Sequence, residues 1–223
     1  MGRVKETAVV LGGQPAVIVR PANAVALYVF AHGAGAGMRH AFMEQMAQAL
    51  AVQKIGTVRW EFPYMAAGKR APDRPPVAQA AVRDVWQATQ VRFGDLPLFA
   101  GGKSFGGRMT SGAHAAERLP DLRGLVFMGF PLYGAGKEPS TERADHLASA
   151  AGPILFVQGT RDELAALPTL RPVVTRLGKR ATLHVVEGAD HGFDVLARSG
   201  RTGAEVRAEI AGAVAAWMRD RIR

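Results

Sequence analysis

Short apolar segments rich in β-branched residues alternate with longer amphipathic segments along most of this chain, and that alternation limits the folds open to it. The short segments predict strands and the long ones predict helices. Strands separated by helices pair in parallel, so we expect an α/β fold with about eight strands in a mostly parallel sheet, flanked by helices on both faces. The predicted strands are Thr7–Leu11, Ala16–Arg20, Val25–Ala31, Gly56–Phe62, Leu96–Ala100, Leu125–Gly129, Pro153–Gln158 and Thr182–Glu187.

The predicted turns and helices complete this pattern. The segment Gly12-Gly13-Gln14-Pro15 joins the first two strands as a hairpin. A chain of 223 residues can bury a substantial core and has the length of one domain, so we interpret residues 1–223 as a single domain. The predicted helices are Arg39–Gln53, Val77–Phe93, Phe105–Glu117, Ala165–Leu177 and Glu205–Arg221.

The composition, 48% hydrophobic and 21% charged residues, is typical of a globular, soluble protein. No apolar run is long enough to cross a bilayer, and the first residues lack the apolar stretch of a secretory signal. We therefore expect a cytoplasmic protein with no membrane partner. The chain has no cysteine, which excludes disulfides, thiolate metal ligands and cysteine nucleophiles.

The net charge of +9 raises the question of nucleic-acid binding. Of the 28 basic residues 22 are arginine, and they are spread along the chain, whereas a nucleic-acid-binding domain has a basic stripe or a recognisable module. The charge therefore indicates an arginine-rich protein without a nucleic-acid partner. The chain also lacks H-E-x-x-H and comparable ligand spacings, so we expect neither a metal nor a cofactor.

One serine stands at a position typical of a nucleophile. The sequence Gly102-Lys103-Ser104-Phe105-Gly106 follows a predicted strand and opens a predicted helix. Glycines on both sides of a serine allow a turn so tight that the hydroxyl stands exposed above the sheet edge. The helix directs its first N–H groups and its positive end at a reacting carbonyl oxygen. The first hypothesis is therefore an enzyme that cleaves esters or amides.

The same glycine, lysine and serine also end the phosphate-binding motif G-x-x-x-x-G-K-[ST]. That motif needs a glycine five residues before Gly102, where the chain has Pro97. A proline in the preceding strand does not supply the wide backbone loop that surrounds phosphates, so this alternative fails.

A second glycine-rich loop, His32-Gly33-Ala34-Gly35-Ala36-Gly37, follows the strand Val25–Ala31. Such a loop can present a backbone N–H to a developing negative charge, with a second donor just after the serine. The alternative is a dinucleotide fingerprint, G-x-G-x-x-G. Its third glycine would fall on Met38 or His40, so hydride transfer remains a distant alternative even though Glu61 could suit a ribose.

A serine nucleophile needs a base, and the base needs an orienting carboxylate. Asp162 follows the strand that ends near Gln158, and His191 follows the strand that ends near Glu187. Alone, the aspartate would be read as a helix N-cap and the histidine as a surface loop residue. Together with Ser104 they stand after three separate strands in the order Ser, Asp, His, which is typical of one of the folds that host such triads.

The chain resembles an α/β-hydrolase over essentially its full length. More closely, His32-Gly33-Ala34-Gly35-Ala36, Gly102-Lys103-Ser104-Phe105-Gly106-Gly107-Arg108 and Asp190-His191-Gly192-Phe193 resemble small dienelactone-hydrolase-like proteins. The elbow with Lys103 is similar to a branch that includes a subunit of an animal chromatin-modifying complex. The resemblance implies Ser104 as nucleophile, Asp162 as acid, His191 as base, and Phe105 and Ala34 as oxyanion donors. True dienelactone hydrolases use a cysteine nucleophile, so their substrate does not carry over.

The segment Phe130–Gly152 is where this fold commonly carries a lid. It is short and interrupted by prolines and glycines, so it predicts a shallow, largely open cleft beside Phe130, Tyr133 and Phe193. With Lys103 these aromatic residues are the expected substrate contacts. Basic residues near the serine could attract an anionic ester, but solvated charge in an arginine-rich protein is the favoured explanation.

The sequence as a whole predicts a serine hydrolase. Its substrates would be small carboxylic esters or thioesters, cleaved through an acyl-enzyme. The alternative is a catalytically silent interaction protein that keeps the fold.

Overall fold

The computed structural model describes residues 2–222 and contains an eight-stranded sheet with the strand order β1-β2-β4-β3-β5-β6-β7-β8. The strands from β3 to β8 run parallel, and the β1–β2 hairpin joins the sheet antiparallel to β4. This is the mostly parallel α/β sheet that the sequence predicts. The strands are β1 (Glu6–Leu11), β2 (Gln14–Val19), β3 (Ala26–Ala31), β4 (Ile55–Trp60), β5 (Leu98–Lys103), β6 (Leu122–Met128), β7 (Ile154–Gly159) and β8 (Ala181–Val186).

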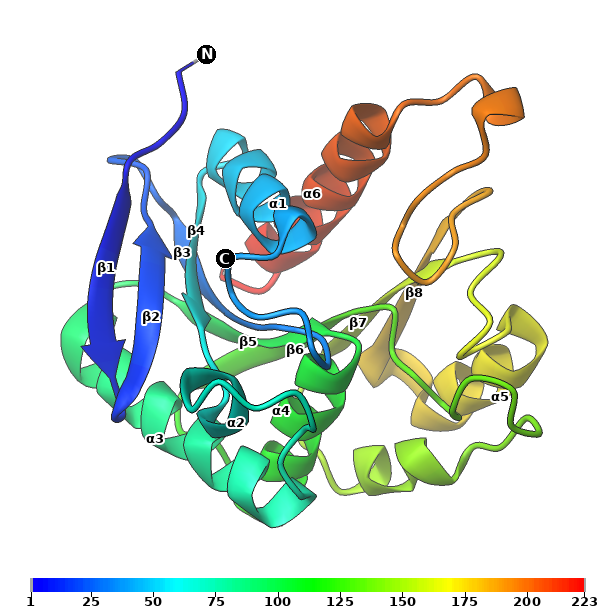
Figure 1. Cartoon of the computed structure of the whole chain (residues 1–223), viewed down its shortest axis with the longest axis horizontal. Coiled ribbons are helices and arrows are strands. Elements are labelled where there is room, and N and C mark those ends of the chain that lie inside the picture. Colours follow the sequence, from blue (N-terminus) through cyan, green and yellow to red (C-terminus); the bar gives the residue numbers. More distant parts are fainter. Residues whose placement is uncertain (1, 223) are drawn as a thin grey trace.

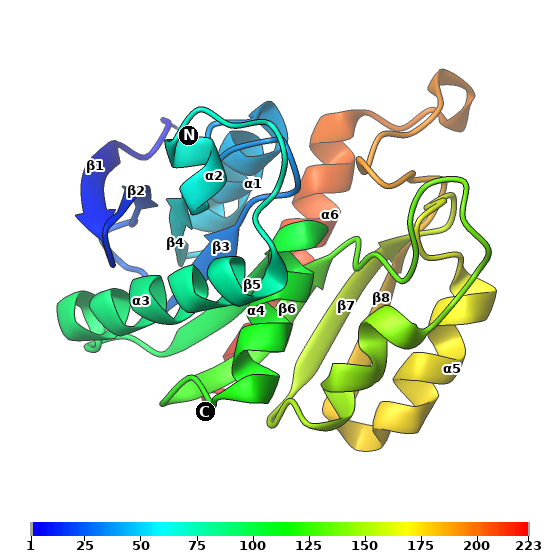
Figure 2. The same ribbon diagram turned by 60° about the horizontal axis from the view of Figure 1, so that its bottom comes forward.

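Helices cover both faces of the sheet. Figure 1 shows α1 (Ala41–Val52) and α6 (Gly203–Arg219) side by side on one face. Figure 2, a turned view, shows the other face with α3 (Pro75–Phe93), α4 (Phe105–Ala116) and α5 (Leu167–Leu177). The short helix α2 (Pro63–Ala66) precedes α3, and three 3-10 helices occur at Glu142–Ala148, Gly178–Arg180 and Ala197–Ser199. Among residues 2–222, no helix combines the length and the apolar character needed to cross a bilayer.

The helix starts follow local sequence signals. Helices α2, α3 and α5 each have a proline in the first turn, where its missing N–H costs no intrahelical hydrogen bond. Thr202 caps α6, and its hydroxyl and the carboxylate of Glu205 satisfy each other's backbone N–H groups in a capping box. The first turns of these four helices are thus stabilised by local residues, by proline in three of them and by the capping box in α6.

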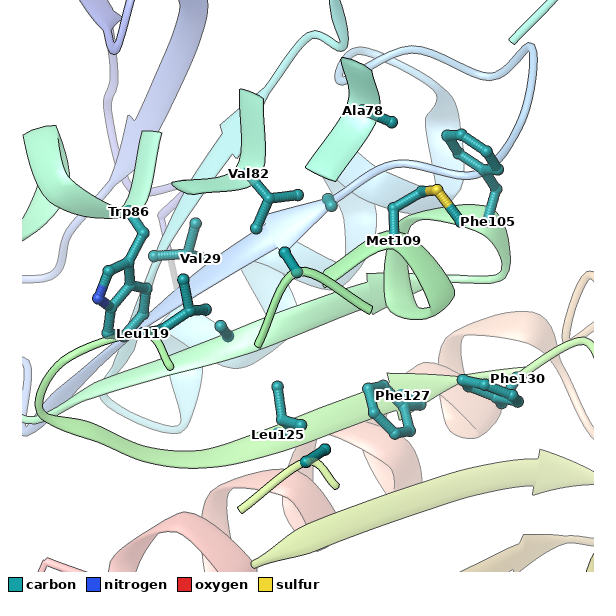
Figure 3. Close-up of a cluster of buried hydrophobic side chains, with 14 of the residues drawn as sticks. Val29, Ala78, Val82, Trp86, Phe105, Met109, Leu119, Leu125, Phe127 and Phe130 are labelled. Carbon is teal, nitrogen blue, oxygen red and sulfur yellow. The ribbon is translucent and has the colours of Figure 1, made fainter. Parts of the chain in front are cut away.

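The hydrophobic core lies in two layers, one on each face of the sheet. Figure 3 shows the layer beneath α3 and α4, where Val29 of β3 and Phe127 of β6 lie on the same side as Val82, Trp86 and Met109 of the two helices. The other layer packs β-strand residues such as Tyr28 and Phe99 against α1 and α6. Strands β3, β4 and β7 are buried along their whole length, which explains why β3 and β7 appear as nearly continuous apolar runs in the sequence.

Several boundaries differ from the sequence prediction. Strand β5 continues to Lys103 instead of ending at Ala100, because its pairing with β6 extends to Lys103 opposite Met128. Strand β6 begins at Leu122, before the predicted Leu125. The sequence pattern also missed α2 and the 3-10 helix Glu142–Ala148, both of which are too short to show a helical period.

The carboxyl ends of the parallel strands all lie at one edge of the sheet. The loops after β3, β5, β7 and β8 therefore converge there, as is usual for ligand sites in open α/β sheets.

Candidate active site

Ser104 occupies a sharp turn between β5 and α4. Its backbone has φ 50° and ψ −116°, a conformation that a non-glycine residue adopts only when its surroundings hold it there. The flanking glycines are required for space. A Cβ on Gly102 would stand 2.4 Å from the carbonyl oxygen of Ala31, and a Cβ on Gly106 would stand 2.5 Å from the same oxygen. The close approach of β3, β5 and α4 thus fixes the serine at the sheet edge.

Ser104, His191 and Asp162 form a continuous hydrogen-bond chain. Nε2 of His191 lies 2.9 Å from Oγ of Ser104, and Nδ1 of His191 lies 2.8 Å from Oδ2 of Asp162. An ionised carboxylate only accepts hydrogen bonds, so Nδ1 carries the proton and Nε2 is left to accept from the serine hydroxyl. The arrangement is that of a nucleophile with an oriented general base.

The buried carboxylate of Asp162 is held by two further donors. Nε2 of Gln158 donates to Oδ2 at 2.6 Å, and the backbone N–H of Leu164 donates to Oδ1 at 2.8 Å. Gln158 is itself fixed, because its side-chain oxygen accepts from the N–H of Phe130. The sequence analysis missed Gln158. Its signal was a glutamine at the end of a fully buried apolar strand, where an amide needs a partner.

The two neighbouring carboxylates have other surroundings. Glu163 is exposed. Asp190 accepts from the N–H groups of Gly192 and Asp194 through Oδ1, and so shapes the loop that presents His191.

The loop after β3 lies against the serine and is held by side chains from the next strand and helix. The hydroxyl of Tyr64 accepts from the N–H of Gly35, and the carboxylate of Glu61 accepts from the N–H of Met38. His32 accepts from the N–H of Phe62 through Nε2, and its Nδ1 contacts the carbonyl oxygen of Gly33 at 2.7 Å. These contacts give Glu61 and His32 structural roles in the loop.

Ala34 and Phe105 are the predicted oxyanion donors. Ala34 lies in the loop after β3 and lines the same cavity as Ser104 and His191. Phe105 is the first residue of α4, where backbone N–H groups have no partner inside the helix. Phe105 directly follows the serine and Ala34 lines the same cavity, so both positions suit the predicted role.

A cavity of about 310 Å³ opens at Ser104, small for a ligand site. A larger cavity, about 750 Å³, lies between the N-terminal segment, α1 and α6, but none of the hydrogen-bonded triad lines it. The chemistry therefore favours the smaller cavity as the substrate site. It is lined by Gly33, Ala34, Ala36, His40, Phe42, Met43, Lys103, Ser104, Leu164, His191 and Gly192.

Lys103 lines this cavity, but its ammonium turns toward the acid. The Nζ atom of Lys103 lies 5.6 Å from the ring centroid of Phe193. Gly129 provides a common reference point for the surrounding atoms: if this residue carried a Cβ, Nζ of Lys103 would lie 3.1 Å from it. Oδ2 of Asp162 and Cε1 of His191 both lie 3.4 Å from the same point. Burial lowers the pKa of Lys103 to about 8, and the carboxylates of Asp162 and Asp190 only partly offset this effect.

The aromatic residues expected beside the cleft lie elsewhere. Phe130 is fully buried against Phe127 and Phe156, and the hydroxyl of Tyr133 accepts from the backbone N–H of Ala166. Phe193 is buried, and its ring stacks on the ring of Phe42 with 5.6 Å between the centroids. Phe42 lines the cavity, whereas Phe193 lies behind it and does not. The left-handed backbone at Gly129 (φ 67°) precedes the segment that leads Phe130 into the core. Leu164 and Phe42 form the apolar wall instead.

The segment Phe130–Gly152 carries one short 3-10 helix, Glu142–Ala148, which packs on α4 and α5. Among residues 2–222, no three His, Asp or Glu side chains are grouped to hold a metal ion.

A Ser–His–Asp hydrogen-bond chain at the carboxyl edge of this sheet is the arrangement that defines the α/β-hydrolase class. Residues 24–219 match the family model described as "Alpha/beta hydrolase domain", and the chain belongs to this family.

Solved structures show the same fold. The chain is similar to a dienelactone hydrolase from Anabaena variabilis, with 18% identity, a TM-score of 0.77 and complete coverage of both chains. It is similar to XC6422 from Xanthomonas campestris, described as a serine hydrolase without lid, with 19% identity, 97% coverage of each chain and a TM-score of 0.72. Est1E from Butyrivibrio proteoclasticus, solved with ferulic acid, has 16% identity and a TM-score of 0.70, over 97% of this chain and 99% of that one. The resemblance to the chromatin-complex branch stays a prediction.

Proposed function

We propose that this protein is a serine hydrolase that cleaves small carboxylic esters or thioesters through an acyl-enzyme. The observation that carries the proposal is the hydrogen-bond chain from Ser104 through His191 to Asp162. The names of the similar structures, which include a dienelactone hydrolase and a serine hydrolase, support the same class of reaction.

In the proposed mechanism, Oγ of Ser104 attacks the carbonyl carbon while Nε2 of His191 accepts the hydroxyl proton. The carbonyl oxygen becomes an oxyanion, which the N–H groups of Phe105 and Ala34 stabilise. His191 then gives its proton to the leaving alcohol or thiol, and the acyl group remains on the serine. A water molecule then attacks the acyl carbon while Nε2 of His191 accepts its proton. His191 gives this proton to Oγ of Ser104 as the acyl–oxygen bond breaks and the carboxylic acid leaves.

Asp162 keeps the imidazole in the tautomer that this mechanism needs and stabilises the imidazolium formed in each step. Gln158 and the N–H of Leu164 hold the carboxylate in place. Lys103 lines the substrate cavity and contributes a positive charge there, while the ring of Phe193, 5.6 Å from its Nζ, lies outside the cavity lining.

The cavity favours short acyl groups. Its volume of about 310 Å³ and the short segment that follows β6 leave no enclosed tunnel for a long chain. The proposed substrates are therefore small molecules. We also propose that residues 1–223 form a single domain and that the protein is cytoplasmic.

A fluorophosphonate probe tests the proposal directly, because it labels only an activated serine. We expect labelling of the wild type and none of Ser104→Ala. Ser199→Ala, which changes an exposed serine outside the site, is the matched control and should label fully. A folded wild-type protein that does not label would instead favour the interaction protein without activity.

A further inference from the structure

A third cavity, of about 370 Å³, lies along α4. It shares no lining residue with the cavity at Ser104. Its wall combines the beginning of α3, one side of α4 and the 3-10 helix Glu142–Ala148 (Figure 2 shows α3 and α4 together). No carboxylate is among its lining residues, which are Pro75, Gln79, Arg108, Met109, Gly112, Ala115, Ala116, His146 and Ser149.

Arg108 is the charged centre of this cavity and forms no ion pair with a carboxylate of residues 2–222. Its Nε is buried and has no hydrogen-bond partner among residues 2–222, and its guanidinium carbon lies 6.0 Å from the ring centroid of Phe105. Burial lowers the pKa of Arg108, and the next cause is another cation, Arg143, which lowers it further. A partly buried charge beside a like charge is unfavourable unless an opposite charge joins it.

The imidazole of His146 also lines this cavity, and its hydrogen bond to Ser111 defines its tautomer. The hydroxyl of Ser111 donates to the carbonyl oxygen of Arg108 at 3.0 Å, so its one hydrogen is used. Ser111 therefore accepts at 2.7 Å from Nε2 of His146, which carries the proton in the neutral ring. Nδ1 remains able to take a second proton. Burial and then Arg108 lower the pKa of His146, while Asp145 opposes them, so burial first and the neighbouring cation second favour the neutral ring.

We propose that this cavity binds a small oxyanion, the carboxylate or phosphate group of a small molecule, with Arg108 as its principal charged ligand. The planar guanidinium fits the oxygen pairs of both groups. Gln79, Ser149 and His146 lie around the same space and supply neutral hydrogen-bonding groups. The volume exceeds that of a bare oxyanion and leaves room for a small organic remainder.

The proposal also has a pH consequence. A bound anion would offset the positive field of Arg108 at His146, so protonation of His146 and anion binding favour each other. Asp145, on the same 3-10 helix, is the opposing carboxylate. Affinity for succinate, which stays largely a dianion, should therefore rise as pH falls from 8 toward 6.5, whereas inorganic phosphate loses negative charge in this range and does not test this consequence.

The test is isothermal titration of the full chain with inorganic phosphate and, separately, with succinate, at constant ionic strength in chloride. We expect saturable binding of at least one probe at one site, and the tighter probe identifies the chemistry. Arg108→Met should weaken it by about tenfold or more, since a charged hydrogen bond is lost. Arg198→Met removes the same charge from an exposed position and should bind as the wild type does.

Two further variants keep the outcome decisive. Ser104→Ala should bind the probe unchanged, because the site is separate from the proposed nucleophile. If Arg108→Met does not fold, Arg108→Lys keeps the charge but loses the planar fork, and it should bind more weakly than the wild type. The proposal is overturned if the wild type binds neither probe saturably, or if a folded Arg108 variant binds as tightly as the wild type.

Discussion

The substitution Asp162→Asn removes the charge that orients His191, the proposed catalytic base, while it keeps the shape of the side chain. The surroundings of the carboxylate leave the amide no satisfactory orientation. With its oxygen in the place of Oδ2, the amide still accepts from His191 and Gln158, but its NH₂ group then faces the N–H of Leu164. A buried hydrogen bond is lost, and the charge that stabilises the imidazolium is gone.

The opposite orientation is worse for catalysis. The NH₂ group would then stand between two donors, Nε2 of Gln158 and Nδ1 of His191. The ring could accept at Nδ1 only by moving its proton to Nε2, where it could no longer accept from Ser104. Each lost charged hydrogen bond is worth about 1.5–3 kcal/mol, and loss of the correct tautomer adds to this. We therefore expect kcat to fall by a factor of roughly 10² to 10⁴.

The assay is hydrolysis of p-nitrophenyl acetate at pH 7.5, with the folded fraction checked by circular dichroism. Glu163→Gln, an exposed neighbour, and Asp190→Asn, which affects the histidine loop, are the matched controls. Glu163→Gln should keep nearly full activity. The reasoning is refuted if Asp162→Asn keeps a third or more of the wild-type kcat while one of the control variants loses activity instead.

Four further predictions follow from the same geometry. Ser104→Ala should abolish turnover yet unfold within about 2 °C of the wild type in calorimetry, since no core cavity forms; near wild-type hydrolysis by clean protein would contradict it. Gly102→Ala should give little folded protein, since its Cβ would stand 2.4 Å from the carbonyl oxygen of Ala31; a soluble, fully active variant would disprove the space argument. The lowered pKa of Lys103, about 8, means that the unfolded chain holds this proton more strongly, so this residue adds stability as pH rises from 8 toward 10.5. Lys103→Met should accordingly be more resistant to urea than the wild type at pH 7, with the difference shrinking by pH 10; equal differences at both pH values would contradict this. In a series of nitrophenyl esters from acetate to palmitate, kcat/KM should favour the short acyl chains, and a steady rise toward palmitate would exclude the small open cavity.

The sheet and the grouping of Ser104, His191 and Asp162 could be predicted because their signals are local. The strands are apolar runs of regular spacing, and Ser104, Asp162 and His191 each follow one of them directly. The topology then brings them together without any further information, since parallel strands share a carboxyl edge.

The cavity wall could not be predicted in the same way. Whether Phe130 points to the cleft or to the core depends on the backbone direction after Gly129 and on the space left by Phe127 and Phe156. Neither the backbone direction nor the space in the core can be read from the amino-acid sequence alone. The same is true of Lys103, whose position in the sequence suggests an exposed charge but whose ammonium lies near Asp162.

The place of β8 in the strand order has a consequence for folding. Ser104 follows β5 in the middle of the sheet, whereas His191 follows β8, which is the last strand on one side. The two residues are 87 positions apart in the chain, so their contact forms only when the long-range pairings are complete. An edge strand opens more readily than a central one. Partial unfolding at β8 would therefore move His191, the proposed base, away from Ser104, the proposed nucleophile, which would stay in place after β5. Activity should then be lost before most of the helices unfold.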